Sequence, residues 1–374
     1  MICIAINSLG RGGAERSILL LAEELVRRGQ QLRIVCLFAL RDEYPIPETL
    51  RKLVVRLNAP SMLPAFVSLY RYLRKQRPAL VFSLMPQSNL ASVLACRWLG
   101  LPVMTSERTT PTLFYRPRPK LALALLPHAI STRAVFISHY ALDHGLPHNL
   151  LGRMVRRHAS VLHNPVPSPV PLAAAQASRC ERLRRLRAWA QAPEAGNTPA
   201  LKLLLASRLV PGKGVLEFLH AASTLLQAGR VRVTIAGTGP LESPLHALAA
   251  EQPVAGSIQV LGFVDEVHAA YADTDVVVLS SESEGFGRVG FEAYQAGCLV
   301  LGTRHNSFGS EVIPDAPAWQ VSKSLSPLSP ALVALAGRAI PDDGSDIAAM
   351  QQALGIATHA DRFTALLSEA MTHA

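Results

Sequence analysis

The chain has 374 residues, enough for two domains of ordinary size, and 49% of them are hydrophobic, so each domain can bury a substantial core. Only 17% are charged, which argues against a long disordered tail. The five cysteines are scattered without CxxC spacing, which argues against a disulfide framework or a structural zinc site and favours a reducing compartment.

Positive charge is concentrated in the first half of the chain. Residues 1–190 carry 27 Lys and Arg against 9 Asp and Glu, whereas the remaining residues carry 10 against 18. Such a basic half favours an anionic partner, which could be a membrane surface, a nucleic acid or a phosphorylated substrate. The chain opens directly on a strand-like apolar run, and Pro127, His128 and Arg133 interrupt the longest apolar stretch, so we expect no signal peptide and no membrane span.

Residues 1–165 alternate short apolar runs with helical patterns. Residues 14–29 have apolar side chains at helical spacing and end at Gly29, a plausible C-cap, and residues 89–100 form a second helical segment. Apolar runs that predict strands cover residues 1–7, 31–38, 78–84, 102–107 and 133–138. This alternation predicts an N-terminal, Rossmann-like domain with a doubly wound parallel sheet.

Residues 166–200 are rich in proline, then in basic residues, and we expect an interdomain connection there. Their segment RCERLRRLRAW, residues 179–189, fits either a solvated helix or a contact with a membrane or partner. The alternation of strands and helices then resumes in residues 201–345, which predicts a second Rossmann-like domain. Residues 346–374 fit a single C-terminal helix, which could pack back on the first domain.

The first candidate site is the segment NSLGRGGAER, residues 7–16, between the first strand and the first helix. Gly10, Gly12 and Gly13 allow a tight turn and a close backbone approach to a ligand. Free N–H groups at the start of the following helix could bind a phosphate. A glycine turn without a ligand explains the same residues, so both interpretations stay open.

Two more candidate segments follow strands of the second domain. In ASRLVPGKG, Arg208 and Lys213 are two cations on one loop that could hold a diphosphate, or they could be ordinary surface charges. In IAGTGP, Gly237 and Gly239 could allow a close ligand contact or simply a tight turn.

The segment SESEGFGRVGFE places two acids around a glycine turn. Glu284 lies in the loop after a strand, a helix begins near Arg288, and Glu292 lies about one turn into that helix. The free amides of the helix start would face a phosphate, while both carboxylates could accept hydrogen bonds from hydroxyl groups. This arrangement suggests that the acids bind the hydroxyl groups of a sugar or ribose while the start of the helix binds a phosphate between them.

The segment ADTDV resembles a DxD metal site, since Asp273 and Asp275 are spaced that way. It precedes its strand, however, whereas ligands of open parallel sheets bind at the carboxyl ends of strands. We therefore interpret it as a turn.

Taken together, these segments resemble the family-4 retaining glycosyltransferases of GT-B fold, over most of the chain. Five segments occur in the order and at the separations of that family: GGAER, SRLVPGKG, AGTGP, LGFV and SEGFGRVGFEA. A sixth, HNPVP, occurs before the expected hinge, as it does in that family. Glu284 and Glu292 match its E-x7-E signature. The resemblance implies an α/β fold of two doubly wound domains with parallel sheets facing across a cleft.

The resemblance also implies roles for single residues. Arg208 and Lys213 would hold the donor diphosphate, with Glu284 on the sugar hydroxyls and Glu292 on the ribose. Phe263 and Val264 would lie beside the base, and Gly12 and Gly13 would close over the donor. The other implied donor-binding positions are Gly237, Gly285, Phe286, Gly287, Arg288 and Val289. No metal and no other cofactor is expected.

The chain departs from this family in its first domain. Where many relatives have a histidine after a strand, this chain has VMTSERTTP, with Glu107 and Arg108. Arg108 stays protonated and cannot act as a base. We expect it either to contact a phosphate or the acceptor, or to form a structural salt bridge with Glu107 or another acid.

The first domain resembles enzymes that extend lipid-linked or cell-surface saccharides, including lipopolysaccharide, in its segments FSLMPQSN, SERTTP and FISHY. The acceptor that this resemblance implies is a glycan or lipid-linked saccharide, which would lie against the first domain. The basic stretches YRYLRKQR, YRPRPK and MVRRH favour an anionic membrane surface, each Lys or Arg contributing about 1 kcal/mol. We therefore expect a cytoplasmic protein, attached peripherally to the inner face of the membrane. Ordinary solvated arginines are the alternative.

The resulting expectation is a metal-independent, retaining transfer of a hexose or N-acetylhexosamine from a nucleotide sugar, UDP-linked by preference. A sugar-nucleotide epimerase of the same fold is an alternative, although the acid/base set it needs is not found. A nucleic-acid partner is not expected, because aromatic residues make up only 6% of the chain and no such motif is present.

Overall fold

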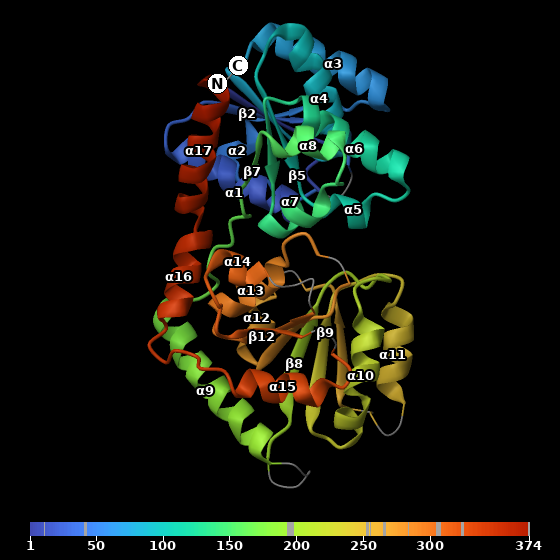
Figure 1. The fold of residues 1–374 in the computed structure, drawn as a ribbon, viewed down its shortest axis with the longest axis vertical. Coiled ribbons are helices and arrows are strands. Elements are labelled where there is room, and N and C mark those ends of the chain that lie inside the picture. The colour runs from blue at the N-terminus through green and yellow to red at the C-terminus, as the bar shows by residue number, and fades with distance from the viewer. Residues whose placement is uncertain are drawn as a thin grey trace. The chain divides into compact units, whose positions relative to one another are not determined.

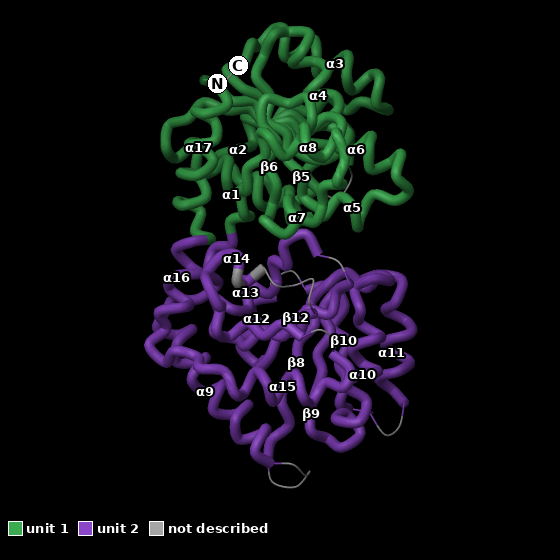
Figure 2. The backbone as a smooth tube through the Cα atoms, in the orientation of Figure 1, with its two compact units in different colours: residues 1–165, 354–374 green, residues 166–353 purple. Residues whose placement is uncertain are grey.

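The computed structural model describes residues 1–10, 12–40, 43–192, 198–251, 254, 256–264, 267–282, 284–303, 308–322 and 325–372. The chain forms two compact units (Figure 2). Unit 1 comprises residues 1–165 and 354–374, and unit 2 comprises residues 166–353. Each is a parallel sheet flanked by helices, as expected from the alternation in the sequence (Figure 1).

The sheet of unit 1 has seven parallel strands in the order β3-β2-β1-β4-β5-β6-β7. They are β1 Ile2–Ile6, β2 Leu32–Cys36, β3 Val54–Arg56, β4 Leu80–Leu84, β5 Val103–Glu107, β6 Arg133–Phe136 and β7 Ala159–Val161. In β1, Ile2 is paired with Leu32 on one side and Leu80 on the other. The order of strands reverses between β1 and β4, and ligands of open α/β sheets bind beyond the carboxyl ends of strands at such a switch point.

Helices cover both faces of this sheet. They are α1 Gly13–Arg27, α2 Glu48–Arg51, α3 Met62–Gln76, α4 Pro86–Leu99, α5 Pro111–Phe114, α6 Arg118–Ile130, α7 His139–Gly145, α8 Leu150–Arg156 and α17 Ile356–Thr372. Side chains of β1 alternate between two cores: Ile4 packs with α1 and α17, and Ala5 packs with α3 and α4. Because both faces are covered, the strands are mostly apolar.

The sheet of unit 2 has six parallel strands in the order β10-β9-β8-β11-β12-β13, with its switch point between β8 and β11. They are β8 Leu201–Ala206, β9 Val231–Ala236, β10 Ile258–Gly262, β11 Val276–Leu279, β12 Leu299–Thr303 and β13 Trp319–Ser322. The helices are α9 Leu172–Gln191, α10 Val215–Gln227, α11 Glu242–Ala250, α12 His268–Ala272, α13 Arg288–Gln295, α14 Phe308–Val312, α15 Leu328–Ala336 and α16 Ser345–Leu354.

The C-terminal segment differs from the single helix expected from residue 346. It forms two helices, α16 and α17, separated at Gly355, whose carbonyl accepts the N–H of His359 in the first turn of α17. Glycine is a poor residue for a helix interior because ordering its backbone costs more entropy. Phe363 of α17 then packs against Phe82 of β4, with ring centroids 5.0 Å apart, so the last helix completes the core of unit 1.

Residues 166–200 are more than a connection, because they include the 20-residue helix α9 of unit 2. Its arginines are not all solvated: Arg179 and Arg182 are buried. Arg179 donates to the carbonyl of Tyr294 at 2.8 Å, and Arg182 donates to the carbonyl of Tyr271 at 2.5 Å. Both carbonyls lie at the C-terminal ends of helices, where the partial negative charge of the helix attracts cations. Neither interpretation of this basic segment anticipated such internal capping.

Of the helices described, none combines the length and the apolar composition that a membrane crossing requires.

Candidate functional site

At the switch point of unit 2, the loop after β8 is hydrogen-bonded to the loop after β11. Ser280 Oγ donates to the carbonyl of Lys213 at 2.8 Å, and the N–H of Glu282 donates to the carbonyl of Gly212 at 3.0 Å. Gly214, with φ of +68°, lies so close that a Cβ there would be 2.2 Å from the carbonyl oxygen of Ser280. The two loops therefore form one rigid surface beyond the ends of the central strands.

An ion pair lies on this surface. Lys213 Nζ is 2.6 Å from Glu284 Oε2, and the two side chains are 18% and 26% exposed. The structure thus brings together two of the residues singled out in the sequence, which lie 71 positions apart. An ammonium held by a carboxylate and still open to solvent can exchange part of that contact for an incoming anion.

Arg208 lies on the same β8 loop with an exposed side chain, and no described residue pairs with its guanidinium. Its loop is fixed by the N–H of Leu209, which donates to the carbonyl of Thr238 at 2.8 Å. Gly237, in the loop after β9, has φ of +140°, and a Cβ there would be 1.8 Å from the carbonyl oxygen of Ser207. Close approach of two loops is therefore a sufficient reason for that glycine.

Helix α13 begins directly after the Glu284 loop. Its N-cap is Gly287, with φ of +64°, a left-handed conformation that favours glycine. Gly285 is half-buried before it, while the ring of Phe286 is buried and stacks on Phe291 with centroids 4.5 Å apart. Phe286 can therefore offer a ligand only its backbone, whereas the N–H groups of Arg288 and Val289, the first two of α13, are available as donors.

The second acid, Glu292, is held differently from Glu284. It is 5% exposed, accepts a hydrogen bond from Arg288 Nε at 2.7 Å and receives the hydroxyl of Tyr271 at 3.3 Å. Burial, reinforced by the Glu292 charge, raises the pKa of Tyr271 well above its usual range, so this hydroxyl remains a donor. Nη1 and Nη2 of Arg288 are buried and have no hydrogen-bond partner among the described residues. Buried donors of this kind call for a ligand or water.

Phe263 and Val264 follow β10 at the same edge of the sheet. Phe263 is 55% exposed and Val264 is half-buried. The preceding carbonyl, of Gly262, accepts the N–H of Gly237 at 2.7 Å. The loop that carries this exposed ring is thus bonded to the loop after β9, which in turn is bonded to the β8 loop of Arg208.

The ADTDV segment lies at the amino end of β11, the opposite edge of the sheet. Asp275 Oδ2 accepts the N–H of Lys202 at 2.9 Å, and its other oxygen is 3.1 Å from Arg185. Asp273 forms an ion pair with the Lys202 side chain. Within the described part of the chain, no three His, Cys, Asp or Glu side chains are grouped as a metal site would require.

The switch point of unit 1 is built around Asn7, which the sequence analysis did not single out beyond its segment. Its Oδ1 accepts hydrogen bonds from the N–H and Oγ of Ser88, at 3.0 and 2.9 Å. Gly12 is the N-cap of α1, and a Cβ there would lie 2.3 Å from Glu15 Oε2, whereas Gly13 faces open space. The position of Asn7, a polar residue at the end of an apolar strand, was the feature of the sequence that could have identified it.

Glu107 is used by its own loop. It is 4% exposed, and its Oε1 accepts the N–H groups of Arg108 and Thr109 at 2.8 and 2.9 Å. Its Oε2 lies 3.4 Å from Nε2 of the buried His128. The salt bridge between Glu107 and the Arg108 guanidinium, one of the alternatives that the sequence left open, is not among the ion pairs of the described residues. Glu107 instead shapes the loop after β5 through the backbone.

Arg108 is therefore a half-buried cation with one buried spare donor. Burial lowers its pKa to about 10, while Glu107 and Glu15 counteract that effect, so it remains charged at neutral pH. Its Nε has no hydrogen-bond partner among the described residues. Burial raises the pKa of Glu15, which Arg108 opposes. This arrangement leaves the guanidinium able to bind an anion or a hydroxyl group.

His359 of α17 gives unit 1 a defined sensitivity to acid. Burial, together with the charge of Arg108, lowers its pKa to about 3, against about 6.5 when unfolded. Between these values the unfolded chain binds one more proton, so we expect stability to fall by about 1.4 kcal/mol per pH unit as pH drops below about 6. Unfolding of His359→Leu between pH 7 and 4 should show a shallower decline than the wild type. His246→Leu, which changes an exposed histidine, should keep the wild-type decline. Equal slopes of stability against pH in all three proteins would contradict the role of His359.

Two family models match successive parts of the chain. Residues 11–169 match the model described as Glycosyltransferase Family 4, and residues 190–324 match the model described as Glycosyl transferases group 1.

Curated relatives match over shorter segments. An uncharacterised glycosyltransferase of Methanocaldococcus jannaschii is 32% identical over 138 residues, which is 33% of this chain and 35% of that protein. The lipopolysaccharide core biosynthesis glycosyltransferase LpsE of Rhizobium meliloti is 32% identical over 97 residues, 26% of this chain and 28% of LpsE. The chain thus matches about a third of each relative's length.

Solved structures match over nearly the whole chain. Anabaena HepE in complex with UDP has a TM-score of 0.73 at 16% identity and covers 98% of this chain and 99% of its own. The lipopolysaccharide outer core galactosyltransferase WaaB, in its apo form, has a TM-score of 0.72 at 13% identity, with coverages of 98% and 99%. At such identities the similarity shows the fold, which is GT-B.

Proposed function

This chain belongs to the family-4-like glycosyltransferases of GT-B fold, and we propose that it moves a hexose or N-acetylhexosamine from a UDP-linked donor to a saccharide acceptor, with retention and without a metal. The observation that carries the proposal is the Lys213–Glu284 pair at the switch point of unit 2, beside Arg208 and the start of α13.

The diphosphate is the part of the donor whose charge grows as the glycosidic bond breaks. Arg208, Lys213 and the free amides at the start of α13 are the groups of unit 2 that would stabilise it. Because Lys213 and the amides of α13 are held in place before the reaction, they favour the transition state over the ground state. Three positive or partly positive groups can fill the role that a divalent cation has elsewhere, which supports the metal-independent mechanism.

The two acids would have separate tasks. Glu292, fixed by Arg288 and Tyr271, is a preorganised acceptor for the ribose hydroxyls. Glu284 is more exposed and would accept hydroxyl groups of the sugar while Lys213 orients it. The unpartnered Nη atoms of Arg288 would meet an oxygen of the donor.

The choice of nucleotide and acceptor is supported by the relatives. HepE was solved with UDP and with UDP-glucose, and exposed Phe263 would stack on a base in this chain. LpsE and WaaB are named for lipopolysaccharide, which supports a glycan or lipid-linked saccharide acceptor. Arg108, whose Nε has a spare N–H, would bind this acceptor. The five cysteines of the chain are free thiols, which supports a cytoplasmic location.

The donor is tested first by binding. UDP-glucose, UDP-galactose, UDP-N-acetylglucosamine, UDP-N-acetylgalactosamine and GDP-mannose should be compared for protection against thermal unfolding, and a UDP sugar should protect most. Slow donor hydrolysis should continue in excess EDTA, and NMR of the first sugar product should show the donor's anomeric configuration. Protection by GDP-mannose alone, loss of activity with EDTA, or an inverted product would each contradict the corresponding part of the proposal.

A further inference from the structure

Exposed apolar side chains of unit 1 gather on one layer of helices. Helices α3, α4, α6 and α8 pack in succession, and α5 packs on α6 (Figure 1). The large hydrophobic residues that this layer exposes are Leu63, Leu94, Trp98, Phe114, Leu123, Leu126, Leu150 and Met154. Elsewhere in the described part of unit 1, only Leu40 and Met371 are exposed in the same way.

Helical spacing places these side chains on shared faces. On α4, Leu94 and Trp98 are four residues apart, as are Leu150 and Met154 on α8. On α6, Leu123 and Leu126 are three residues apart. Trp98 is 72% exposed, yet it is anchored by edge contacts with Phe66 and Tyr70, whose ring centroids are 5.7 and 6.1 Å away. Such a held, exposed tryptophan is typical of a side chain at an apolar–aqueous boundary.

The charge of this layer has one sign. The helices α3, α4, α5, α6 and α8 contain no Asp or Glu, and the exposed Asp143 of the neighbouring helix α7 pairs with Arg156. The exposed cations of the layer are Arg71, Arg74, Lys75, Arg77, Arg97, Arg116, Arg118, Lys120, Arg153, Arg156 and Arg157. On the opposite face, by contrast, Arg28 pairs with Asp361 and Arg133 with Glu369.

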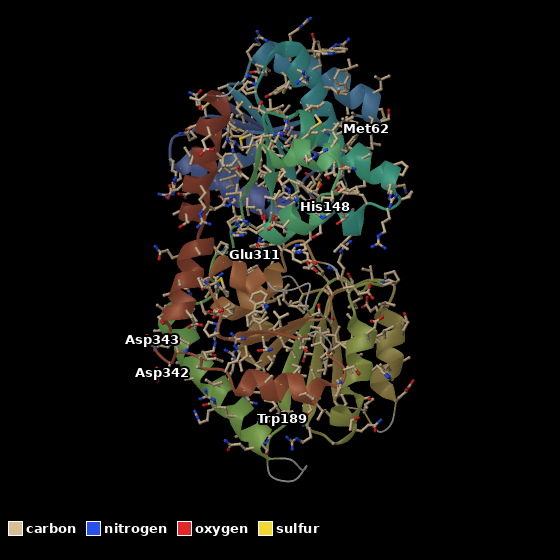
Figure 3. All side chains as sticks on the ribbon, in the orientation of Figure 1. Met62, His148, Trp189, Glu311, Asp342 and Asp343 are labelled. Atoms are coloured by element: carbon tan, nitrogen blue, oxygen red, sulfur yellow. The ribbon has the colours of Figure 1, made fainter. Side chains whose placement is uncertain are left out.

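The same layer contains a cavity of about 680 Å³. Its lining includes the polar side chains of Arg116, Arg118 and His148, the last of which precedes α8 (Figure 3), and the apolar side chains of Leu121 and Leu151. A cavity with cations and aliphatic walls suits a group that is anionic at one end and apolar at the other.

We propose that the layer formed by α3, α4, α5, α6 and α8 docks on an anionic lipid bilayer, with its leucines and Trp98 entering the interface and its cations facing the headgroups. Apolar insertion and charge attraction act together in interfacial binding. A second copy of the chain is a poorer occupant, because two such faces would oppose cations to cations. The inference is independent of the donor chemistry, which we assign to unit 2.

The test is flotation of the full chain with phosphatidylcholine vesicles that contain or lack phosphatidylglycerol. We expect binding to the anionic vesicles, weakening as salt rises, and little binding to the neutral ones. Arg116→Ser/Arg118→Ser/Lys120→Ser and Leu123→Ser/Leu126→Ser should each reduce the partition coefficient at least tenfold. Leu261→Ser/Val333→Ser, which alters similarly exposed side chains of unit 2, should leave it unchanged. All variants should retain donor hydrolysis.

Trp98 provides a direct readout of insertion. Trp189 and Trp319 are buried in unit 2, so acyl-chain quenchers in the bilayer should quench Trp98 selectively. Trp98→Phe should remove the quenching and keep flotation.

Equal binding to neutral and anionic vesicles, or binding unaffected by both variant sets, would overturn the proposal. A dimer that Leu123→Ser/Leu126→Ser dissociates, without vesicle binding, would identify the layer as a contact between copies instead. If the wild type floats with anionic vesicles but does not hydrolyse any donor, the donor assignment is contradicted and the membrane proposal is not.

Discussion

Lys213→Ala should lower kcat for sugar transfer by about 10²–10³-fold. Removing one preorganised group that stabilises developing charge in a transition state typically has this effect, equivalent to about 3–4 kcal/mol. Glu284→Ala should lower kcat to a similar degree, because it removes both a hydroxyl acceptor and the carboxylate that orients Lys213. Steady-state kinetics with a UDP sugar measure both effects.

The chain offers a matched control at the other edge of the same sheet. Lys202 pairs with Asp273 on the surface, as Lys213 pairs with Glu284 at the switch point, and Lys202→Ala should keep wild-type kinetics. The double variant Lys213→Ala/Glu284→Ala should lose less than the sum of the two single effects, since the two groups contact each other. Wild-type rates for Lys213→Ala, in a protein with unchanged thermal stability, would remove Lys213 from the mechanism.

Arg179→Ala should lower the free energy of unfolding of unit 2 by about 3–5 kcal/mol. Arg179 is 1% exposed, and its guanidinium joins three elements: it is 2.9 Å from Asp346 Oδ2 of α16 and donates to the carbonyls of Tyr294 and Gly297. Its removal leaves the buried Asp346 carboxylate with the Tyr294 hydroxyl but without a cation, and takes one donor from each of the two carbonyls, which costs more than the lost contact itself. Urea unfolding measures the change.

Arg184 on the same helix α9 is the control, because it is 74% exposed and pairs only with Glu181 on the surface. Arg184→Ala should change stability little, as exposed pairs do. Fluorescence of Trp189, buried on α9 (Figure 3), reports this unit during unfolding. Similar losses in the two arginine variants would mean that burial does not decide the effect.

Most of the fold could be predicted because parallel strands buried on both faces have a strong signal. Runs such as residues 78–84 and 231–236 are apolar, short and followed by helical patterns. The strands that were missed, β3, β7 and β13, have only three or four residues each, with half-buried or exposed positions. Such edge strands depend on pairing with a neighbour more than on their own composition.

The charged groups of the candidate site were found singly, and their pairing was not. Lys213 and Glu284 follow different strands, and only the strand order, with β8 beside β11, brings them to 2.6 Å. Arg179 and Arg182 escaped notice for a related reason: repeated arginines on a helix usually indicate a solvated face, and nothing local to them indicates the carbonyls they cap. Long-range partners of this kind are set by tertiary packing.

The return of α17 to unit 1 has a consequence for biosynthesis. Unit 2 is one continuous segment, residues 166–353, whereas unit 1 needs Phe363 and Leu367 to complete its hydrophobic core. Chains emerge from the ribosome N-terminus first, and domains generally fold as units. The part of this protein that is translated first must therefore wait for the last helix, and the part translated second can reach its native packing sooner.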